Sequence, residues 1–267
     1  MATIVARIVP TPLLQRRRAL YLVERSIYVY RRTWMIVFSG FFEPLFYLFS
    51  MKVGIGGLVG TVAIAGRPVR YIDFVAPALL ASSAMNGAVF DSTMNVFYKL
   101  KHAKTYDAVL ATPLDAGDVA LGEITWALIR GTLYAAAFEV VMLAMGLVHS
   151  SWAVLVVPGA ILIGFAFAAV GMTMTCYMRS WQDFEYVTLS TLPLFLFSAT
   201  FYPLGTYSPV LQWIVRATPL YQGVALERAL CLGTIGWATV GHALYLAGMG
   251  LAGLRMSSRR LGRVLLP

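Results

Sequence analysis

Six stretches of the chain are each apolar over about the 20 residues that a helix needs to cross the hydrocarbon layer of a membrane. They lie at about 33–51, 71–98, 124–148, 152–177, 186–202 and 233–254. Charged residues make up only 12% of the chain and hydrophobic residues 59%, whereas soluble domains carry about 25% charged residues. So little charge cannot keep a folded surface of this size in water, which argues against a soluble enzyme, a nucleic-acid-binding protein and a disordered chain. We therefore expect an all-α, polytopic membrane protein with six transmembrane helices.

One further segment, 203–232, precedes the last stretch and is amphipathic rather than uniformly apolar. It contains Pro203, Pro209 and Pro219, and proline interrupts a helix because it lacks a backbone N–H and clashes with the preceding turn. We interpret the segment as short re-entrant helices that dip into one membrane interface. A seventh span is the alternative.

The lysines and arginines fall mostly on one side of the predicted bundle, and cytoplasmic loops carry such an excess. With six spans both termini lie on the same side, which holds 15 of the basic residues against five on the other. We therefore place both termini in the cytoplasm, the 203–232 segment outside, and the chain in the inner (cytoplasmic) membrane. The net charge of +9 then reflects topology, and no nucleic-acid partner is expected.

The residues before the first span form a second amphipathic segment. Between Leu13 and Arg32, apolar residues recur at helical spacing and arginines lie largely between them. This pattern predicts a cytoplasmic interfacial helix within residues 1–32, with its arginines toward anionic lipid head groups. Residues 255–267 form a basic tail, so residues 1–267 make a single transmembrane domain around a six-helix bundle at 33–254.

Polar residues occur at membrane depth in the first three apolar stretches, where they are costly and usually face a partner or a cavity. Together with two phenylalanines of the fifth stretch, they give a set of candidates for a translocation path. The candidates are Glu43, Pro44, Asn86, Glu139, Phe195 and Phe197. Contacts that only join helices are the alternative for the polar residues, and contact with lipid is the alternative for the phenylalanines.

Two further charged residues lie inside predicted spans. Asp91 falls in the second stretch and Arg130 in the third. Arg130 is close enough to the inner surface for its long side chain to reach the interface, and a contact between helices is the alternative. Asp91 is interpreted, like the other polar residues, as a contact between helices or a part of the path.

The connection between the second and third stretches, residues 99–123, is too polar to cross the membrane and too regular to be a bare linker. Tyr106, Val109 and Leu110 follow helical spacing and so share one face of a short helix. Lys104 and Asp107 lie beside that face. A second subunit could bind a short amphipathic helix held at the inner surface.

Both ends of this short helix can be predicted from local chemistry. Thr112-Pro113 ends it, because the residue before a proline is disfavoured in the helical region. Asp115 and Asp118 then open the next helix, where carboxylates favour the positive end of the helix dipole.

These residues resemble the signature loop of the type-2 ATP-binding-cassette (ABC) exporter permeases. The branch that the chain resembles is the nodulation protein J group, which is similar to lipo-oligosaccharide exporters and to some drug exporters. The resemblance covers most of residues 33–232, and its order and spacing make it specific. Its segments are Thr105–Leu114 with Asp118 and Leu121–Glu123, Phe42–Tyr47, Ala76–Leu80, Ser83–Asn86, Phe197–Pro203 and Thr218–Tyr221.

The resemblance implies a half-transporter, in which two six-span permeases pair with two cytoplasmic ATPase subunits. It leaves open whether the second permease is a copy of this chain or a paralogue. It implies a coupling helix that contacts the ATPase through Lys104, Thr105, Tyr106, Asp107, Leu110, Thr112, Pro113 and Leu114. A lesser contact would come from residues 178–185, and residues 203–232 would close the exit. This chain has Asp107 where the family usually has Glu, which keeps the chemistry.

The chain holds no G-x-x-x-x-G-K-[ST] phosphate loop, so ATP must be bound and hydrolysed by another chain, and no cofactor, metal or catalytic residue is expected. The resemblance then implies outward movement of an amphipathic substrate, a lipo-oligosaccharide or other glycolipid, or a hydrophobic drug. An ion-coupled secondary transporter that uses Glu43 and Glu139 is the alternative function. An intramembrane enzyme fits less well, because the three histidines of the chain form no catalytic motif.

Overall fold

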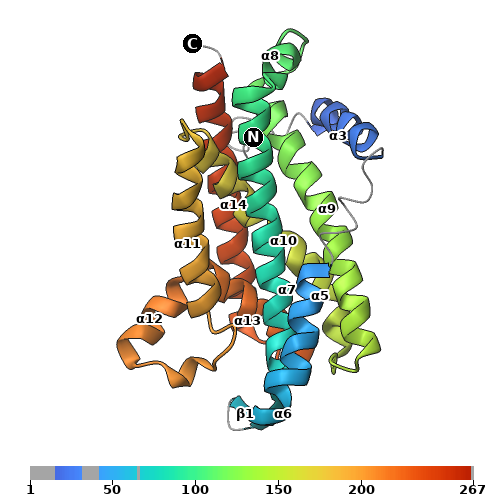
Figure 1. Cartoon of the computed structure of the whole chain (residues 1–267), viewed down its shortest axis with the longest axis vertical. Helices are drawn as coiled ribbons and strands as arrows, with labels where there is room; N and C mark the ends of the chain where they lie inside the picture. The colour runs from blue at the N-terminus through green and yellow to red at the C-terminus, as the bar shows by residue number, and fades with distance from the viewer. Residues whose placement is uncertain (1–15, 32–41, 65–66, 266–267) are drawn as a thin grey trace.

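The computed structural model describes residues 16–31, 42–64 and 67–265, and all of its long elements are helices (Figure 1). The helices are α3 (Arg16–Arg31), α5 (Phe42–Ser50), α6 (Gly56–Val59), α7 (Tyr71–Phe90), α8 (Thr105–Leu110), α9 (Ala116–Ala144), α10 (Val156–Thr175), α11 (Phe184–Phe197), α12 (Pro209–Ala217), α13 (Pro219–Leu232) and α14 (Trp237–Leu265). Wide π-helical turns form η1 (Met51–Ile55), η2 (Asp91–Asn95) and η3 (Tyr98–His102), and tight 3-10 turns form η4 (Ser151–Leu155), η5 (Trp181–Asp183) and η6 (Leu204–Thr206). A two-stranded antiparallel hairpin of β1 (Thr61–Ile64) and β2 (Arg67–Arg70), which was not predicted, joins α6 to α7.

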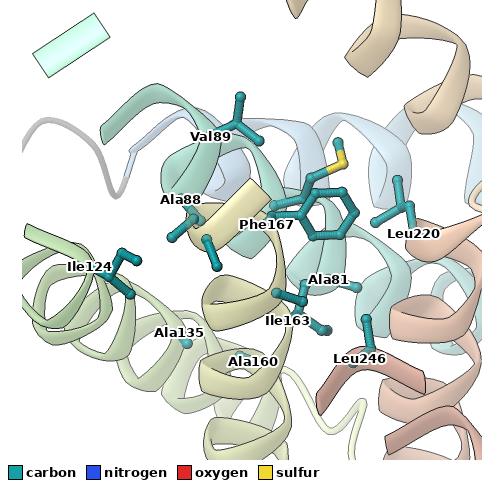
Figure 2. Close-up of a cluster of buried hydrophobic side chains, with 14 of the residues drawn as sticks. Ala81, Ala88, Val89, Ile124, Ala135, Ala160, Ile163, Phe167, Leu220 and Leu246 are labelled. Atoms are coloured by element: carbon teal, nitrogen blue, oxygen red, sulfur yellow. The ribbon is translucent and has the colours of Figure 1, made fainter. Parts of the chain in front are cut away.

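The core lies where α7 and α10 pack against α9, α13 and α14. Small and apolar side chains from these five helices fill it, including Ala81 and Ala88 of α7 and Ile163 and Phe167 of α10 (Figure 2). Small residues let helix backbones approach closely, which is a main source of packing energy where lipid removes the hydrophobic difference between helix and surroundings. The bundle is therefore held by close backbone contact more than by bulky side chains.

At the crossing of α10 and α14, a glycine lies directly against the backbone of the other helix. A Cβ added at Gly253 would lie 2.9 Å from the backbone of Ala169 and Val170. The hydroxyl of Thr173 donates a hydrogen bond of 3.0 Å to the carbonyl of Gly253. A glycine is thus required at this crossing.

Three helical stretches in the described part of the chain are long and apolar enough to cross a membrane. They are Tyr71–His102, Ala116–Ala144 and Ser151–Thr175, and they fall on the second, third and fourth predicted spans. The first predicted span lies partly in residues 32–41, outside the described residues, and α11 is shorter than a full span. The count of six therefore stays a prediction.

Helices extend beyond the apolar stretches at several points. The helix that starts at Tyr71 continues through η2 and η3 to His102, and α9 begins at Ala116, so the predicted 99–123 loop is largely helical. At its other end, α14 runs through the predicted basic tail to Leu265. Hydropathy marks where lipid ends, and a helix continues past that point until a cap or a breaker stops it.

The two ends of the molecule differ in what they present (Figure 1). One end carries α3, α8 and the last turns of α14, and the other carries the β1–β2 hairpin and α12. Exposed aromatic residues mark both ends, with Trp152, Trp213 and Trp237 toward the hairpin end and Trp181 and Tyr186 toward the α8 end. Such rings favour the two membrane–water interfaces, and the orientation of the two ends across the membrane stays a prediction.

Candidate functional site

The short helix α8 has the two faces that the sequence predicts. It starts after Lys104, whose φ of 46° is left-handed and turns the chain sharply after η3. Tyr106 and Val109 are buried, with Tyr106 only 1% exposed, whereas Lys104 and Asp107 are exposed. The helix therefore has an anchored apolar face and a polar face that points away from the bundle.

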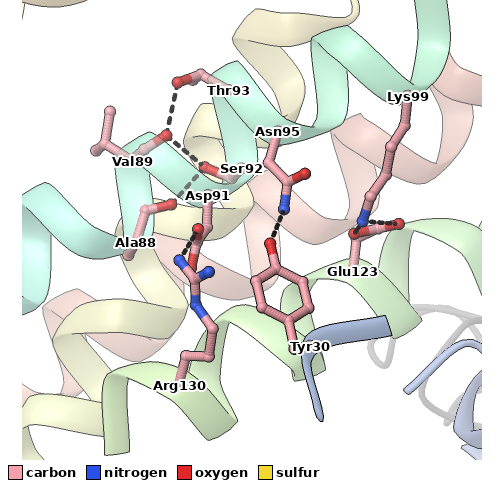
Figure 3. A network of polar contacts seen from close by, with 10 residues as sticks. All are labelled: Tyr30, Ala88, Val89, Asp91, Ser92, Thr93, Asn95, Lys99, Glu123 and Arg130. Carbon is pink, nitrogen blue, oxygen red and sulfur yellow. Dashed lines mark hydrogen bonds and ion pairs between the residues drawn. The ribbon is translucent and has the colours of Figure 1, made fainter. Parts of the chain in front are cut away.

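A cluster of polar groups lies beneath the anchored face. Lys99, at the end of the long helix that includes α7, contacts both carboxylate oxygens of Glu123 in α9 at 2.7 and 3.0 Å (Figure 3). The hydroxyl of Tyr106 lies near this carboxylate without reaching hydrogen-bond geometry. Burial, together with the negative charge of Glu123, raises the pKa of the Tyr106 hydroxyl well above its usual range, so the ring stays neutral.

The far end of the loop is fixed by a capping box and by a contact with α3. The Asp115 carboxylate accepts from the backbone N–H of Asp118 at 2.8 Å, and the Asp118 carboxylate accepts from the N–H of Asp115 at 3.1 Å. This arrangement starts α9 where the sequence places its beginning. Arg18 of α3 donates to the carbonyl of Pro113 at 3.3 Å, so α3 and the α8 loop form one surface.

The helix α3 packs against α9 through a glycine. A Cβ at Gly122 would lie 2.8 Å from the Cβ of Leu22, which shows how closely the two helices approach. At the C-terminal end of α3, the Tyr30 ring lies 5.1 Å from that of Trp126, and its hydroxyl accepts from Asn95 at 3.3 Å (Figure 3). The predicted interfacial helix is thus joined to the bundle along its described length.

An aromatic cluster joins the two connections at this end of the molecule. His102 stacks on Trp181 at 5.1 Å, and Phe97 contacts Trp181 and Phe184 at 5.1 and 5.2 Å. Hydrogen bonds from two backbone N–H groups lower the pKa of Asp183, which keeps its capping carboxylate ionised. The helical stretch that continues from α7 to His102 is therefore packed, at the end that precedes α8, against the start of α11.

Tyr106 provides a direct test of the anchored face. We expect Tyr106→Phe to melt within about a degree of the wild type, because the hydroxyl has no hydrogen-bond partner among the described residues. Tyr106→Ala should be destabilised by about 3–5 kcal/mol, the range for deleting a buried aromatic side chain. Thermal unfolding of the detergent-purified chain measures both, and a large loss in Tyr106→Phe would contradict this account of the anchor.

Arg130 makes a contact between helices, the alternative to extension of its side chain to the interface. Its guanidinium forms an ion pair with Asp91 of η2, and it lies 5.2 Å from the centre of the Tyr30 ring (Figure 3). The two charged side chains are 11% and 6% exposed. Because an opposite charge lay within reach on the adjacent helix, pairing inside the bundle replaced extension to the interface.

The structure does not bring the predicted path residues together. Asn86 of α7 is exposed and Glu139 of α9 is half-buried, and both lie on other helices than the two phenylalanines of α11. Phe195 is half-buried and its ring lies 6.4 Å from that of Tyr47 in α5, whereas Phe197 is exposed. The backbone of Glu43 and Pro44 belongs to α5, but their side chains lie outside the described residues.

Two charged residues of α13 were not predicted as interior groups. Arg228, assigned to the outer surface from the sequence, instead donates to the carbonyls of Ala199 and Phe74 at 2.9 and 3.2 Å and lies 3.7 Å over the Phe74 ring. Glu227 is fully buried. A signal was present, because Glu227 falls at helical spacing with the apolar residues Val224 and Cys231.

Within the described ranges, no group of three metal-ligating side chains is found. What the α8 end offers is a rigidly mounted polar helix, backed by α3, α7 and α9. Such an arrangement presents exposed polar side chains on a helix whose other face is packed against the bundle.

Comparison with known proteins agrees with this picture. Residues 17–231 match the family described as ABC-2 type transporter. The chain is 35% identical to Nodulation protein J of Rhizobium leguminosarum bv. trifolii over 72% of each chain, and 31% identical to that of Rhizobium meliloti (strain 1021), again over 72% of each. It is 29% identical to Nodulation protein J of Sinorhizobium fredii (strain NBRC 101917 / NGR234) over 81% of this chain and 84% of the relative.

Proposed function

The chain belongs to the ABC-2 type transporter family, and from that premise we propose that it carries an amphipathic substrate outward across the inner membrane. As a member of this family it is a non-catalytic permease subunit of an ABC transporter, and the ATPase is a partner chain. The absence of a phosphate loop from the sequence agrees with this division of labour.

The proposed substrate is a lipo-oligosaccharide or other glycolipid, with a hydrophobic drug as the second candidate. Its support is the similarity to the Nodulation protein J sequences over most of the chain, together with the resemblance to lipo-oligosaccharide and drug exporters. A substrate of this kind combines a polar head with an apolar tail. A path along a permease–permease interface, near Glu43, Pro44, Asn86, Glu139, Phe195 and Phe197, would offer both kinds of contact.

The observation that carries the proposed mechanism is the two-faced α8. Its exposed residues, with Thr112 and Pro113 of the following turn, would meet the ATPase. The anchored residues Tyr106 and Val109 would transmit the movement into α7 and α9. The full proposed coupling set is Lys104, Thr105, Tyr106, Asp107, Leu110, Thr112, Pro113 and Leu114, in which Tyr106 acts from the buried side and does not contact the ATPase.

The transporter would contain two permeases and two ATPase subunits. The second permease is either a copy of this chain or a paralogue, and the outer segment 203–232 would close the exit between them. Anionic lipid would lie against the arginines of α3 and of the last turns of α14.

Asp107→Lys tests the coupling role directly. Asp107 is exposed on α8, so we expect the variant to insert and fold normally but to lose most of the ATPase that co-purifies with the tagged permease in mild detergent. Reversal of charge at a docking surface is expected to weaken docking because like charges across an interface are strongly unfavourable.

Glu185→Lys is the matched control, since it makes the same charge change on an exposed residue of the second connection, where a lesser contact is expected. It should reduce ATPase recovery less than Asp107→Lys does. Normal recovery of the ATPase with Asp107→Lys would overturn the coupling assignment. Substrate transport by the chain without any ATPase would instead support the ion-coupled alternative.

A further inference from the structure

Glu227 is a buried acidic residue whose carboxyl group forms no ion pair or hydrogen bond with the described residues. It lies in α13 and is 0% exposed, and neither of its carboxyl oxygens has a hydrogen-bond partner among the described residues. The adjacent Arg228 does not compensate it, because that guanidinium donates to the carbonyls of Phe74 and Ala199. None of the ion pairs of the described residues includes Glu227.

The carboxyl group lies directly against the backbone of α10. A Cβ built on Gly159 would lie 2.5 Å from Oε1 and 3.2 Å from Cδ of Glu227. A second glycine, Gly223 of α13, brings the same two helices together, since its Cβ would lie 3.0 Å from the Ile163 side chain. The space that Glu227 occupies therefore exists only because residue 159 is glycine and α13 is closely packed on α10.

The other titratable groups around this position disfavour a negative charge. Glu139 of α9 acts on Glu227 with a charge of the same sign, and Cys231, one helical turn further along α13, is within electrostatic range of both carboxyls. Arg228 acts on Cys231 but forms no hydrogen bond with Glu227. Glu139 is half-buried, so it connects this interior group with the surface of the bundle.

An ionised carboxylate placed in a dry interior without a cation or a donor is strongly unfavourable, and such a group takes up a proton instead. An acidic residue within the apolar part of a membrane protein is, for the same reason, a candidate functional site. The described contacts of Glu227 include nothing that would stabilise its anion.

We propose that Glu227 is a proton-binding site of the permease. Its carboxyl holds a proton while α13 packs on α10 at Gly159. When α13 moves away from α10, water reaches the group, the O–H bond breaks, and the proton passes to water while the carboxylate stays hydrated. Glu139 assists retention of the proton in the packed state through its like charge. This site is independent of the proposed substrate and coupling helix, and it does not make the proton the driving force for transport.

Infrared spectroscopy of the full-length chain in detergent tests the proposal, because a protonated carboxylic acid has a C=O stretch that an ionised carboxylate lacks. We expect this band at neutral pH in the wild type and its loss in Glu227→Gln. The band should remain in Glu139→Gln, shifted to reflect the lost neighbouring charge. Glu227→Gln should also melt within a few degrees of the wild type, since it replaces a neutral acid by a neutral amide of nearly the same size.

A second pair of variants tests the packing that retains the proton. Gly159→Ala should weaken or shift the band because the added methyl group displaces the carboxyl from α10. Gly241→Ala, at an α14 position where an added Cβ meets nothing within 4 Å, should leave the band unchanged. Absence of a protonated-acid band at neutral pH in the wild type would overturn the proposal, whichever variants fold. So would a band of undiminished intensity in Glu227→Gln.

Discussion

Arg130→Ala is expected to destabilise the permease by about 3–5 kcal/mol, the cost of removing one partner of a buried ion pair. The substitution leaves Asp91 with only 6% of its side chain exposed and without the cation that pairs with it directly. It also removes the cation from the face of the Tyr30 ring. Chemical unfolding in mixed micelles, or the shift in melting temperature, would measure the loss.

A double-substitution cycle separates the stabilisation that the ion pair provides from the cost of leaving one buried charge without its partner. Asp91→Asn combined with Arg130→Gln removes both charges from the site, and we expect the double variant to be less destabilised than either single variant. Arg216→Ala is the control, because Arg216 is exposed in α12 and surface charges contribute only about 0–1 kcal/mol. Equal effects of Arg130→Ala and Arg216→Ala would show that the buried pair contributes nothing to stability.

Gly253→Val is expected to disrupt the crossing of α10 and α14 and to yield little folded protein. The first added carbon already lies 2.9 Å from backbone atoms of Ala169 and Val170, and a backbone cannot move aside as a flexible side chain can. Overpacking in a well-packed core costs about 1–3 kcal/mol for smaller changes, so the branched side chain should exceed that range. Size-exclusion profiles and melting temperature in detergent give the readout.

Gly248→Ala provides the comparison on the same helix. A Cβ at Gly248 meets nothing within 4 Å, and alanine is favoured over glycine in a helix interior by up to about 1 kcal/mol. This variant should match or exceed the wild type in stability. If both glycine variants lose stability to the same degree, the effect belongs to α14 as a whole and the close crossing is not its cause.

The all-α fold class and the two faces of α8 were predictable because each depends on local pattern. The apolar stretches define the helices α7, α9 and α10, and the pair Asp115 and Asp118 marks the start of α9 by a capping interaction over three residues. The amphipathic spacing around Tyr106 predicts which face of α8 is buried. Information of this kind is contained within a few turns of the chain.

The interior polar contacts were not predictable, because each depends on which helices are neighbours. Arg130 finds Asp91 only because α9 packs beside η2, and Arg228 reaches Phe74 and Ala199 only after α13 folds back against α7 and the end of α11. Counting charges on either side of the membrane assigned Arg228 to the surface, since that rule assumes that a basic residue outside the spans is solvated.

The contact of Arg18 with the carbonyl of Pro113 implies an order of biogenesis. These residues are 95 positions apart in the chain, and α3 also depends on Gly122 of α9 for its close packing. Since chains are made from the N-terminus, α3 leaves the ribosome long before the segment against which it docks. The contacts of α3 can therefore form only once α9 has been synthesised and inserted, and a partially made permease lacks the joint surface of α3 and the α8 loop. At the opposite end, 154 positions separate Arg228 from Phe74, so this contact also waits for a late segment of the chain.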